Sequence, residues 1–350
     1  MKKMSGTDSI LNSFDGVSLE DWMTKIHEDL RGKTIEEMDW EFDDELTIKP
    51  FVQSDDIEAG YSSIAYDATW EIAEEFNIVD EVSSNSEILE ALTGGCEVVL
   101  LKVKNIPNWS LLFNEIDLGL IKTYIIPDSE EKTQVLIASL DDFIGSYPGG
   151  TNARTGSTEP LIHVRNDKNA IGGPSAVHLD KTVAKGLANT IQEGIQLITQ
   201  AYDHDTVECV VEIGDAYFVE IARLRALRIL WSNVLDALNK DKPALFIEGR
   251  FSSRDMTDDV HYNMISAGSK AMSAISGGVD RLIIAPAHLE PTAFHRRISR
   301  NIHHILRYES KLDTISDPVK GSYYIEYLTK QLVESAWSKL IDSLKRVTTM

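Results

Sequence analysis

Hydrophobic and polar positions follow two alternating patterns along most of this chain. From about residue 69 onward, short apolar runs are separated by longer stretches in which apolar residues recur at helical spacing. The predicted strands are Thr69 to Phe76, Cys96 to Val103, Ile121 to Pro127, Gln134 to Leu140, Leu161 to Asn166, Ser175 to Leu179, Cys209 to Ile213, Ala244 to Gly249 and Arg281 to Pro286. Nearly continuous apolar strands of this kind belong to parallel sheets that are covered by helices.

The number of predicted strands bears on the choice between two α/β architectures. The nine predicted strands are close to the eight of a closed (β/α)8 TIM barrel, and the count therefore favours that fold. An open doubly wound sheet is the alternative that fits the same pattern. The richest loop is Asp141 to Glu159. As a connection from a strand to a helix, it is expected at the mouth of the barrel, where functional loops gather.

The first part of the chain has a different pattern. Ser18 is a suitable N-cap for an amphipathic helix, and a second short helix and an extended segment ending at Pro50 come after it. The apolar positions that follow the cap at roughly helical spacing are Leu19, Trp22, Met23, Ile26 and Leu30. The sequence therefore predicts an N-terminal arm over residues 1–55 and a barrel domain over residues 56–350.

Composition and charge narrow the class of partner. The chain has 56 acidic and 34 basic residues and a formal charge of -22, which repels phosphate backbones and anionic lipid, so we expect neither nucleic acid nor membrane as a partner. The start of the chain has no signal-peptide pattern, and no apolar run reaches about 18 residues, so a cytoplasmic location is expected. Cys96 and Cys209 lie within apolar runs, which favours buried thiols over a disulfide or a metal site.

Five blocks between Ala216 and Thr329 carry a family resemblance. The first contains A-R-L-R-A-L-R, the second D-D-V-H-Y-N-M, the third A-I-S-G-G-V-D-R-L-I-I, the fourth R-R-I-S-R-N-I-H-H-I-L-R, and the last D-P-V-K-G-S-Y-Y-I-E-Y-L-T. Their order and spacing resemble the acyl-CoA mutase barrel of the methylmalonyl-CoA mutase family. The resemblance extends from about Leu19 to the end of the chain. It implies a TIM barrel and an N-terminal arm that wraps a partner subunit.

His178 is the residue that the resemblance marks for catalysis. In catalytic mutase subunits a Tyr-His pair follows a strand in a comparable setting, where the His hydrogen-bonds the thioester carbonyl and the Tyr helps the cofactor toward homolysis. Here the pair is Val177-His178. Because Val has neither a hydroxyl nor a ring, the radical-generating role is expected to be missing, and His178 is interpreted as vestigial or structural, with contact to a ligand as the alternative.

Arg223, Arg225 and Arg228 share one predicted helix and are the candidates for substrate binding. Arginine forms bidentate contacts with phosphate, so these side chains could bind the phosphates of an acyl-CoA. The structural alternative, which the resemblance favours, is that they tie the helix to the barrel through carboxylates such as Glu220.

Two groups of histidines suggest metal or cofactor chemistry, and the residues around them argue against it. Asp259-Val260-His261 is similar to the D-x-H-x-x-G of cobalamin domains, but Met264 replaces the glycine, and Asn263 and Gly277-Gly278 match a barrel motif of the family instead. His295, His303 and His304 lie in a basic amphipathic helix with no carboxylate or thiol at ligand spacing. The expected core face of this helix is Ile298, Ile302, Ile305 and Leu306, with solvated or interface histidines. No metal site is expected.

The resemblance and these departures from it lead to one expected function. No cobalamin-binding domain is recognisable after the last block, and Tyr is absent beside His178, so the chain resembles the small, non-catalytic subunit of a heterodimeric methylmalonyl-CoA mutase. It would bind no cofactor itself, and its partner, the large subunit, would carry adenosylcobalamin and interconvert methylmalonyl-CoA and succinyl-CoA. The alternatives are a catalytic acyl-CoA mutase barrel with a separate cobalamin-binding subunit and a free-standing protein that binds CoA esters.

Overall fold

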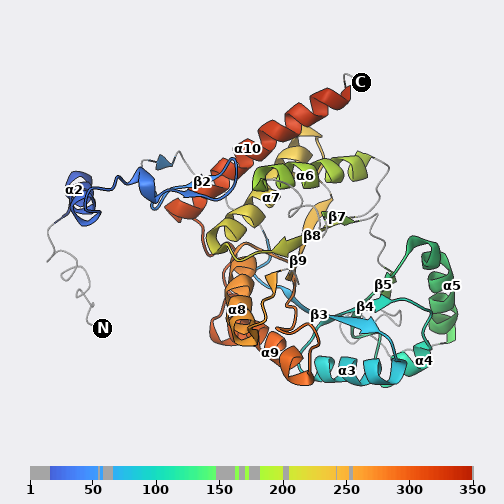
Figure 1. Ribbon diagram of the computed structural model, residues 1–350. Coiled ribbons are helices and arrows are strands. Elements are labelled where there is room, and N and C mark those ends of the chain that lie inside the picture. Colours follow the sequence, from blue (N-terminus) through green and yellow to red (C-terminus); the bar gives the residue numbers. More distant parts are fainter. Residues whose placement is uncertain are drawn as a thin grey trace, which may run out of the picture. The chain divides into compact units, whose positions relative to one another are not determined.

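The computed structural model describes two units of the chain, Met1–Val52 and Gln53–Met350, each of which is treated by itself (Figure 1). The described residues are 16–53, 56–57, 66–146, 162–164, 170–172, 182–199, 205–241, 243–251 and 255–348. Among them, no helix is both long and apolar enough to cross a bilayer.

The first unit contains the predicted amphipathic helix, α2 (Leu19–Asp29). Ser18 caps it as expected: its hydroxyl accepts a hydrogen bond from the backbone N–H of Asp21, and the Asp21 carboxylate accepts one from the backbone N–H of Ser18. The short helix η1 (Glu36–Met38) and an antiparallel pair of strands, β1 (Trp40–Glu41) and β2 (Thr47–Ile48), follow. No residue of α2 is buried, but its apolar face is partly covered, and the ring of Trp22 lies edge-on to that of Phe51 at 4.4 Å.

The second unit is built on one parallel sheet of eight strands. They are β3 (Glu71–Ile78), β4 (Val98–Val103), β5 (Lys122–Pro127), β6 (Ile162–Val164), β7 (Ala170–Gly172), β8 (Thr206–Ile213), β9 (Ala244–Phe251) and β10 (Arg281–Ile283). Their order in the sheet is β6-β5-β4-β3-β10-β9-β8-β7, so the first strand of the unit pairs with its last strand. This order is that of a curled sheet in which successive crossovers step in one direction, and it confirms the expected α/β class with parallel βα units.

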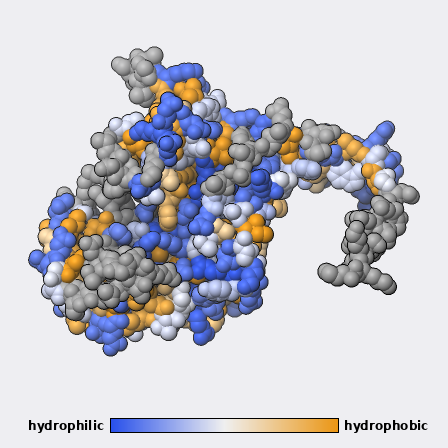
Figure 2. Space-filling model, turned by 180° about the vertical axis from the view of Figure 1, so that it is seen from behind, coloured by the Kyte–Doolittle hydropathy of each residue, from blue (hydrophilic) through white to orange (hydrophobic). Residues whose placement is uncertain are grey.

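Helices cover the outer face of this sheet (Figure 1). They are α3 (Glu81–Thr93), α4 (Trp109–Leu112), α5 (Glu130–Ser146), α6 (Val183–Thr199), α7 (Tyr217–Ala237), α8 (Val260–Ser276), α9 (Ala293–His304), which continues into the π-helical turn η5 (Ile305–Glu309), and α10 (Tyr323–Thr348). Below α3 to α5, Phe76, Leu101 and Ile125 of the sheet pack with Leu112 and Leu140 in a dry core. On the side shown in Figure 2, hydrophilic and hydrophobic residues are interspersed, as on an ordinary protein surface.

The predicted strands differ from the observed ones in two places. The prediction for Gln134 to Leu140 is wrong, because this segment lies inside α5, where Leu136 and Leu140 are buried one helical turn apart. Ser175 to Leu179 lies outside the described residues, and β7 precedes it at a position that was not predicted. Of the loop Asp141 to Glu159, the first six residues belong to α5 and the others lie outside the described residues.

Candidate functional site

The inner face of the curled sheet carries an ion-pair network centred on Arg281. The register places Arg281 of β10 between Glu71 of β3 and Glu248 of β9, with all three side chains on the inner face. Its Nε donates to Glu71 Oε2 at 2.7 Å, Nη1 donates to Glu248 Oε2 at 2.9 Å, and Nη2 donates to the Tyr124 hydroxyl at 2.8 Å. The guanidinium carbon lies 4.3 Å from the ring centre of Tyr124 and 4.8 Å from that of Phe246. Cation–π contacts therefore add to these hydrogen bonds.

Burial and the neighbouring charges shift the pKa of Arg281 in opposite directions. Burial by itself would lower the pKa of Arg281, which has no exposed surface, but Tyr124, Glu71 and Glu248 together raise it above its usual value, so the side chain remains a cation. His163 of β6 stacks at a tilt with Tyr124, and its pKa is lowered by partial burial and by Lys122. The centre of the inner face therefore holds a buried cation that is paired with carboxylates, and the protonated form of His163 is disfavoured beside it.

A second layer of ion pairs lies toward the carboxyl ends of the strands, which is the end where parallel barrels carry their active sites. Glu75 of β3 pairs with Lys102 of β4 at 2.6 Å and with Arg250 of β9 at 3.0 Å. Arg250 Nε also donates to Glu248 Oε1 at 2.6 Å, so Glu248 connects the two layers. Each of these cations has a carboxylate partner, and this layer consequently presents no unopposed charge to an anionic substrate.

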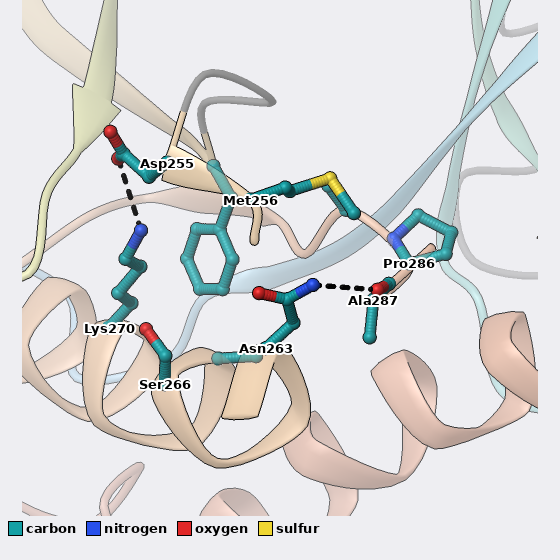
Figure 3. A pocket seen from close by; sticks show the side chains of 10 residues that line it. Asp255, Met256, Asn263, Ser266, Lys270, Pro286 and Ala287 are labelled. Atoms are coloured by element: carbon teal, nitrogen blue, oxygen red, sulfur yellow. Dashed lines mark hydrogen bonds and ion pairs between the residues drawn. The ribbon is translucent and has the colours of Figure 1, made fainter. Parts of the chain in front are cut away.

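A small pocket lies outside the sheet, between the end of β9 and helix α8 (Figure 3). In it, Lys270 of α8 reaches Asp255 at 3.1 Å, and the Asn263 amide donates to the carbonyl of Ala287 at 3.1 Å. Its volume of about 30 Å³ has room for ordered water, whereas a drug-sized ligand needs roughly 300 Å³ or more. We therefore assign this pocket a packing role.

His178 and Val177 lie outside the described residues, shortly after β7 in the chain. The structure accordingly gives no position for the one catalytic candidate of the sequence.

The arginines of α7 are largely buried and paired with carboxylates. Arg223 and Arg225 are 2% and 1% exposed. Arg223 pairs with Glu220 and donates to the carbonyl of Glu212 at 2.6 Å. The pair with Glu220 lies within α7, and the hydrogen bond to Glu212 is the contact that joins Arg223 to β8.

Arg225 joins the first and last sequence blocks that carry the family resemblance. It pairs with Asp317, and its Nη2 lies 2.8 Å from Glu326 Oε1. Glu326 also accepts the backbone N–H of Gly321 at 3.1 Å, so the turn that leads into α10 is attached to α7. Arg228 pairs with Asp280 at 2.8 Å and donates to the carbonyl of Gly278 at 2.5 Å. These contacts join the middle of α7 to the start of α10 and to the segment that follows α8.

The remaining histidines have structural positions. Asp259 is the N-cap of α8, and its Oδ1 accepts the backbone N–H groups of His261 and Tyr262, so His261 is a residue of a covering helix as expected. His303 differs from the expectation of a solvated or interface histidine: it is 2% exposed, and its Nδ1 accepts the indole N–H of Trp70 at 3.0 Å. Within the described part of the chain, no three His, Cys, Asp or Glu side chains gather as metal ligands would.

Comparison with known protein families shows which family this chain belongs to. A family model described as Methylmalonyl-CoA mutase matches residues 175–349, which is half of the chain. The chain belongs to the methylmalonyl-CoA mutase family. The matched region contains α6 to α10 and therefore the Arg225 contacts with Asp317 and Glu326, and it confirms the resemblance drawn from the five sequence blocks.

Several proteins of the methylmalonyl-CoA mutase family are similar to this chain. The methylmalonyl-CoA mutase small subunit of Porphyromonas gingivalis is 23% identical over 396 residues, covering 96% of this chain and 64% of that protein. In Propionibacterium freudenreichii subsp. shermanii, the small subunit is 32% identical over 40% of this chain and 23% of its own length, and the large subunit is 33% identical over 37% and 18%. The matched regions span less than two thirds of each of these relatives.

The sequence did not single out the network around Arg281, Glu71 and Glu248. The available signal was the appearance of charged residues an even number of positions apart in otherwise apolar strands, as for Glu71 and Glu75 in E-I-A-E-E-F and for Glu248 and Arg250 in F-I-E-G-R-F. In a strand this spacing places charges on one face, and here that face is the interior.

Proposed function

We propose that this chain is the small, structural subunit of a heterodimeric methylmalonyl-CoA mutase and that it does not catalyse the reaction by itself. The observation that carries the proposal is the ion-pair network of Arg281 with Glu71 and Glu248 on the inner face of its sheet. The similarity to a protein named small subunit over 96% of the chain supports the assignment. We also propose that the strand order closes into a (β/α)8 barrel, since β3 and β10 already join as the first and last strands of a barrel do.

The contents of the inner face support a scaffold in preference to an acyl-CoA site. Arg281 lies between the rings of Tyr124 and Phe246, and buried ion pairs surround it. A CoA ester needs a concave site of roughly several hundred Å³. Opening one here would separate charges that are paired in a low-dielectric interior, which costs several kcal/mol or so for each uncompensated ion.

The cofactor of the complex is proposed to be adenosylcobalamin, held by the large subunit. When bound, this cofactor supplies the radical that starts the rearrangement. The residues of this chain that most resemble a cobalamin motif do not fit that use, because the Asp259 side chain already caps α8 with two backbone hydrogen bonds. Proteins named large subunit among the relatives support the choice of partner.

Co-expression with a mutase large subunit tests the proposal. Gel filtration should give a stable complex, and methylmalonyl-CoA isomerisation with added adenosylcobalamin should appear in the complex and not in this chain alone. Changing His178→Ala in this chain should leave that activity unchanged, whereas the loss of activity would place a working site here.

The same assay addresses the alternative of a catalytic barrel. Turnover by this chain when only a separate cobalamin-binding protein is added would establish the alternative and contradict the structural role. Tight binding of CoA esters by the isolated chain in isothermal titration would instead favour the third possibility, a CoA-ester-binding protein.

A further inference from the structure

Helix α9 covers the sheet with a different face from the one its sequence predicts. The buried residues of α9 and η5 are Ser299, Arg300, His303, Leu306 and Arg307. Of the predicted core face, Leu306 is buried, Ile298 and Ile302 are only partly covered, and Ile305 is 48% exposed. The strongly polar face of this helix therefore points inward.

Carboxylates on the neighbouring elements explain the inward polar face. Arg300 pairs with Glu74 of β3 at 2.7 Å, and Arg307 pairs with Glu97 at 2.7 Å. Arg296 adds a second contact to Glu74 at 3.3 Å. Burying the apolar face instead would leave Glu74, which is 7% exposed, without a cation. These ion pairs consequently fix the rotation of α9 about its axis.

The outer face of α9 is left with apolar side chains. Phe294, Ile305 and Tyr308 are 50%, 48% and 58% exposed, and with Ile298 they lie opposite the buried residues at helical spacing. Arg297 lies at the edge of this face with its guanidinium 5.7 Å from the ring centre of Phe294. Among the described residues, no carboxylate pairs with Arg297.

A groove runs beside this face, between α9 and α3. It is lined by Leu89, Glu90, Thr93, Gly94, Arg297, Arg300 and Asn301, and its volume is about 460 Å³. Gly94 leaves room for the buried Arg300, since a Cβ there would lie 2.8 Å from Arg300 Nε. The α9 face and the groove form one continuous surface through Arg297. We call it the α9 surface.

Charge favours a different protein chain over a second copy of this chain as the partner that binds the α9 surface. Two copies, each with a formal charge of -22, repel one another over long range. A two-fold contact through α9 would set the same face against itself, and the segment from Ala293 to Tyr308 contains four arginines and no acidic residue. Self-association through α9 would bring no carboxylate of that helix to Arg297, and Glu90 of the groove is already paired with Arg300 at 3.3 Å. A different chain can supply one.

We propose that the α9 surface docks the mutase large subunit through an apolar element that carries a carboxylate for Arg297. The proposal rests on the proposed function, because it takes the large subunit as the partner. Exposed apolar faces of this kind mark interaction sites, and aromatic and arginine side chains supply much of the binding energy at such interfaces.

Two variants on the α9 surface test the proposal. Ile305→Asp places a charge in the centre of the apolar face, and Arg297→Glu reverses the charge at its edge. Each should weaken binding of the large subunit roughly tenfold or more in titration. The matched control is Val135→Asp on α5, a position that is 59% exposed, and it should bind as the unchanged chain does.

Hydrogen exchange of the unchanged chain gives a second readout that needs no variant. Amides from Ala293 to Glu309 should be protected further when the large subunit is added, while those of α5 should not. Unchanged protection, or variants that fold and bind normally, would overturn the α9 surface and leave the proposed function intact.

The remaining outcomes concern the partner. If the unchanged chain does not bind the large subunit, the proposed function and the docking proposal fail together. A homodimer that Ile305→Asp converts to a monomer would overturn the choice of occupant.

Discussion

Arg281 shows how much one residue contributes to the interior of this molecule. It has no exposed surface, and its partner Glu248 has none either. In Arg281→Met, Glu248 loses its buried cation partner at 2.9 Å while its contact with Arg250 remains, so we expect a loss of about 3–5 kcal/mol in the free energy of unfolding. Urea unfolding followed by circular dichroism would measure it.

A second change and a control make this prediction specific. The double variant Arg281→Met/Glu248→Gln should recover part of the loss, because the buried carboxylate charge that lost its Arg281 partner is then removed. Lys345→Ala removes a pair with Asp342 in which both side chains are well exposed, and it should cost little. Equal losses in the Arg281 and Lys345 variants would show that the network contributes nothing beyond a surface pair.

His303 should make stability depend on pH. Burial and the neighbouring Arg307 lower its pKa to about 3 from the ordinary 6.5. Above pH 6.5 the imidazole is neutral in both the folded and the unfolded states. As the pH falls from 6.5 toward 3, only the unfolded state gains the proton, and stability is lost at about 1.4 kcal/mol per pH unit.

Comparison with a variant that cannot titrate isolates this effect. Asn at position 303 can still accept the Trp70 indole N–H. Between pH 7.5 and pH 5 we therefore expect the unchanged chain to lose about 2 kcal/mol more than His303→Asn. Parallel pH profiles of the two proteins would mean that His303 titrates normally in the folded state.

At the scale of elements, two helix glycines should respond oppositely to the same change. A Cβ on Gly194 of α6 would lie 2.4 Å from the Trp231 ring, and the indole N–H of Trp231 is held by the carbonyl of Pro243 at 2.9 Å. A Cβ on Gly268 of α8 would meet no atom within 4 Å. We expect Gly194→Ala to destabilise by about 1–3 kcal/mol and Gly268→Ala to stabilise by about 0.5–1 kcal/mol.

Thermal unfolding of the two glycine variants would provide the measurement. A stabilised Gly194→Ala would show that α6 and α7 can separate without cost.

The cap of α8 gives a test of the D-x-H motif. Asp259→Ala removes the acceptor of two backbone N–H groups and should cost about 1 kcal/mol of stability. His261→Ala, on the exposed side of the same helix, should change stability by less than about 0.5 kcal/mol. Chemical unfolding of both variants is the measurement, and a larger effect at His261 than at Asp259 would contradict the capping role.

Helices α5 and α9 show where sequence patterns stop being informative. In Gln134 to Leu140, an apolar run with a β-branched residue suggested a strand, but Leu136 and Leu140 are the pair that the core accepts, and their spacing is helical. In α9 the sequence correctly placed the apolar residues on one face of the helix. The prediction that this face is buried was wrong, because only Leu306 of it is buried. Glu74 decides that outcome from 226 residues away in the sequence, beyond what a local pattern can show.

At the scale of the whole molecule, the strand pattern was sufficient for the class of fold and insufficient for the site. Nearly continuous apolar runs gave the parallel strands, because burial on both faces leaves a local signature. The network of Arg281 depends on partners 33 and 210 residues distant, which no local pattern pairs. The family blocks located α7 and α10 but not the contact between Arg225, Asp317 and Glu326 that explains their spacing.

The two cysteines report on the integrity of this architecture. Cys96 lies two residues before β4, and Cys209 lies in β8. Both are buried, and burial raises the pKa of each thiol to about 12. Because the thiolate is the reactive form, a disulfide reagent such as Ellman's should modify neither in the native protein at pH 8 and both in denaturant. The rate in the native protein then measures opening of the sheet, and Arg281→Met should raise it for both thiols if the inner network holds the two halves of the sheet together. Acceleration at only one thiol would show instead that the halves open independently.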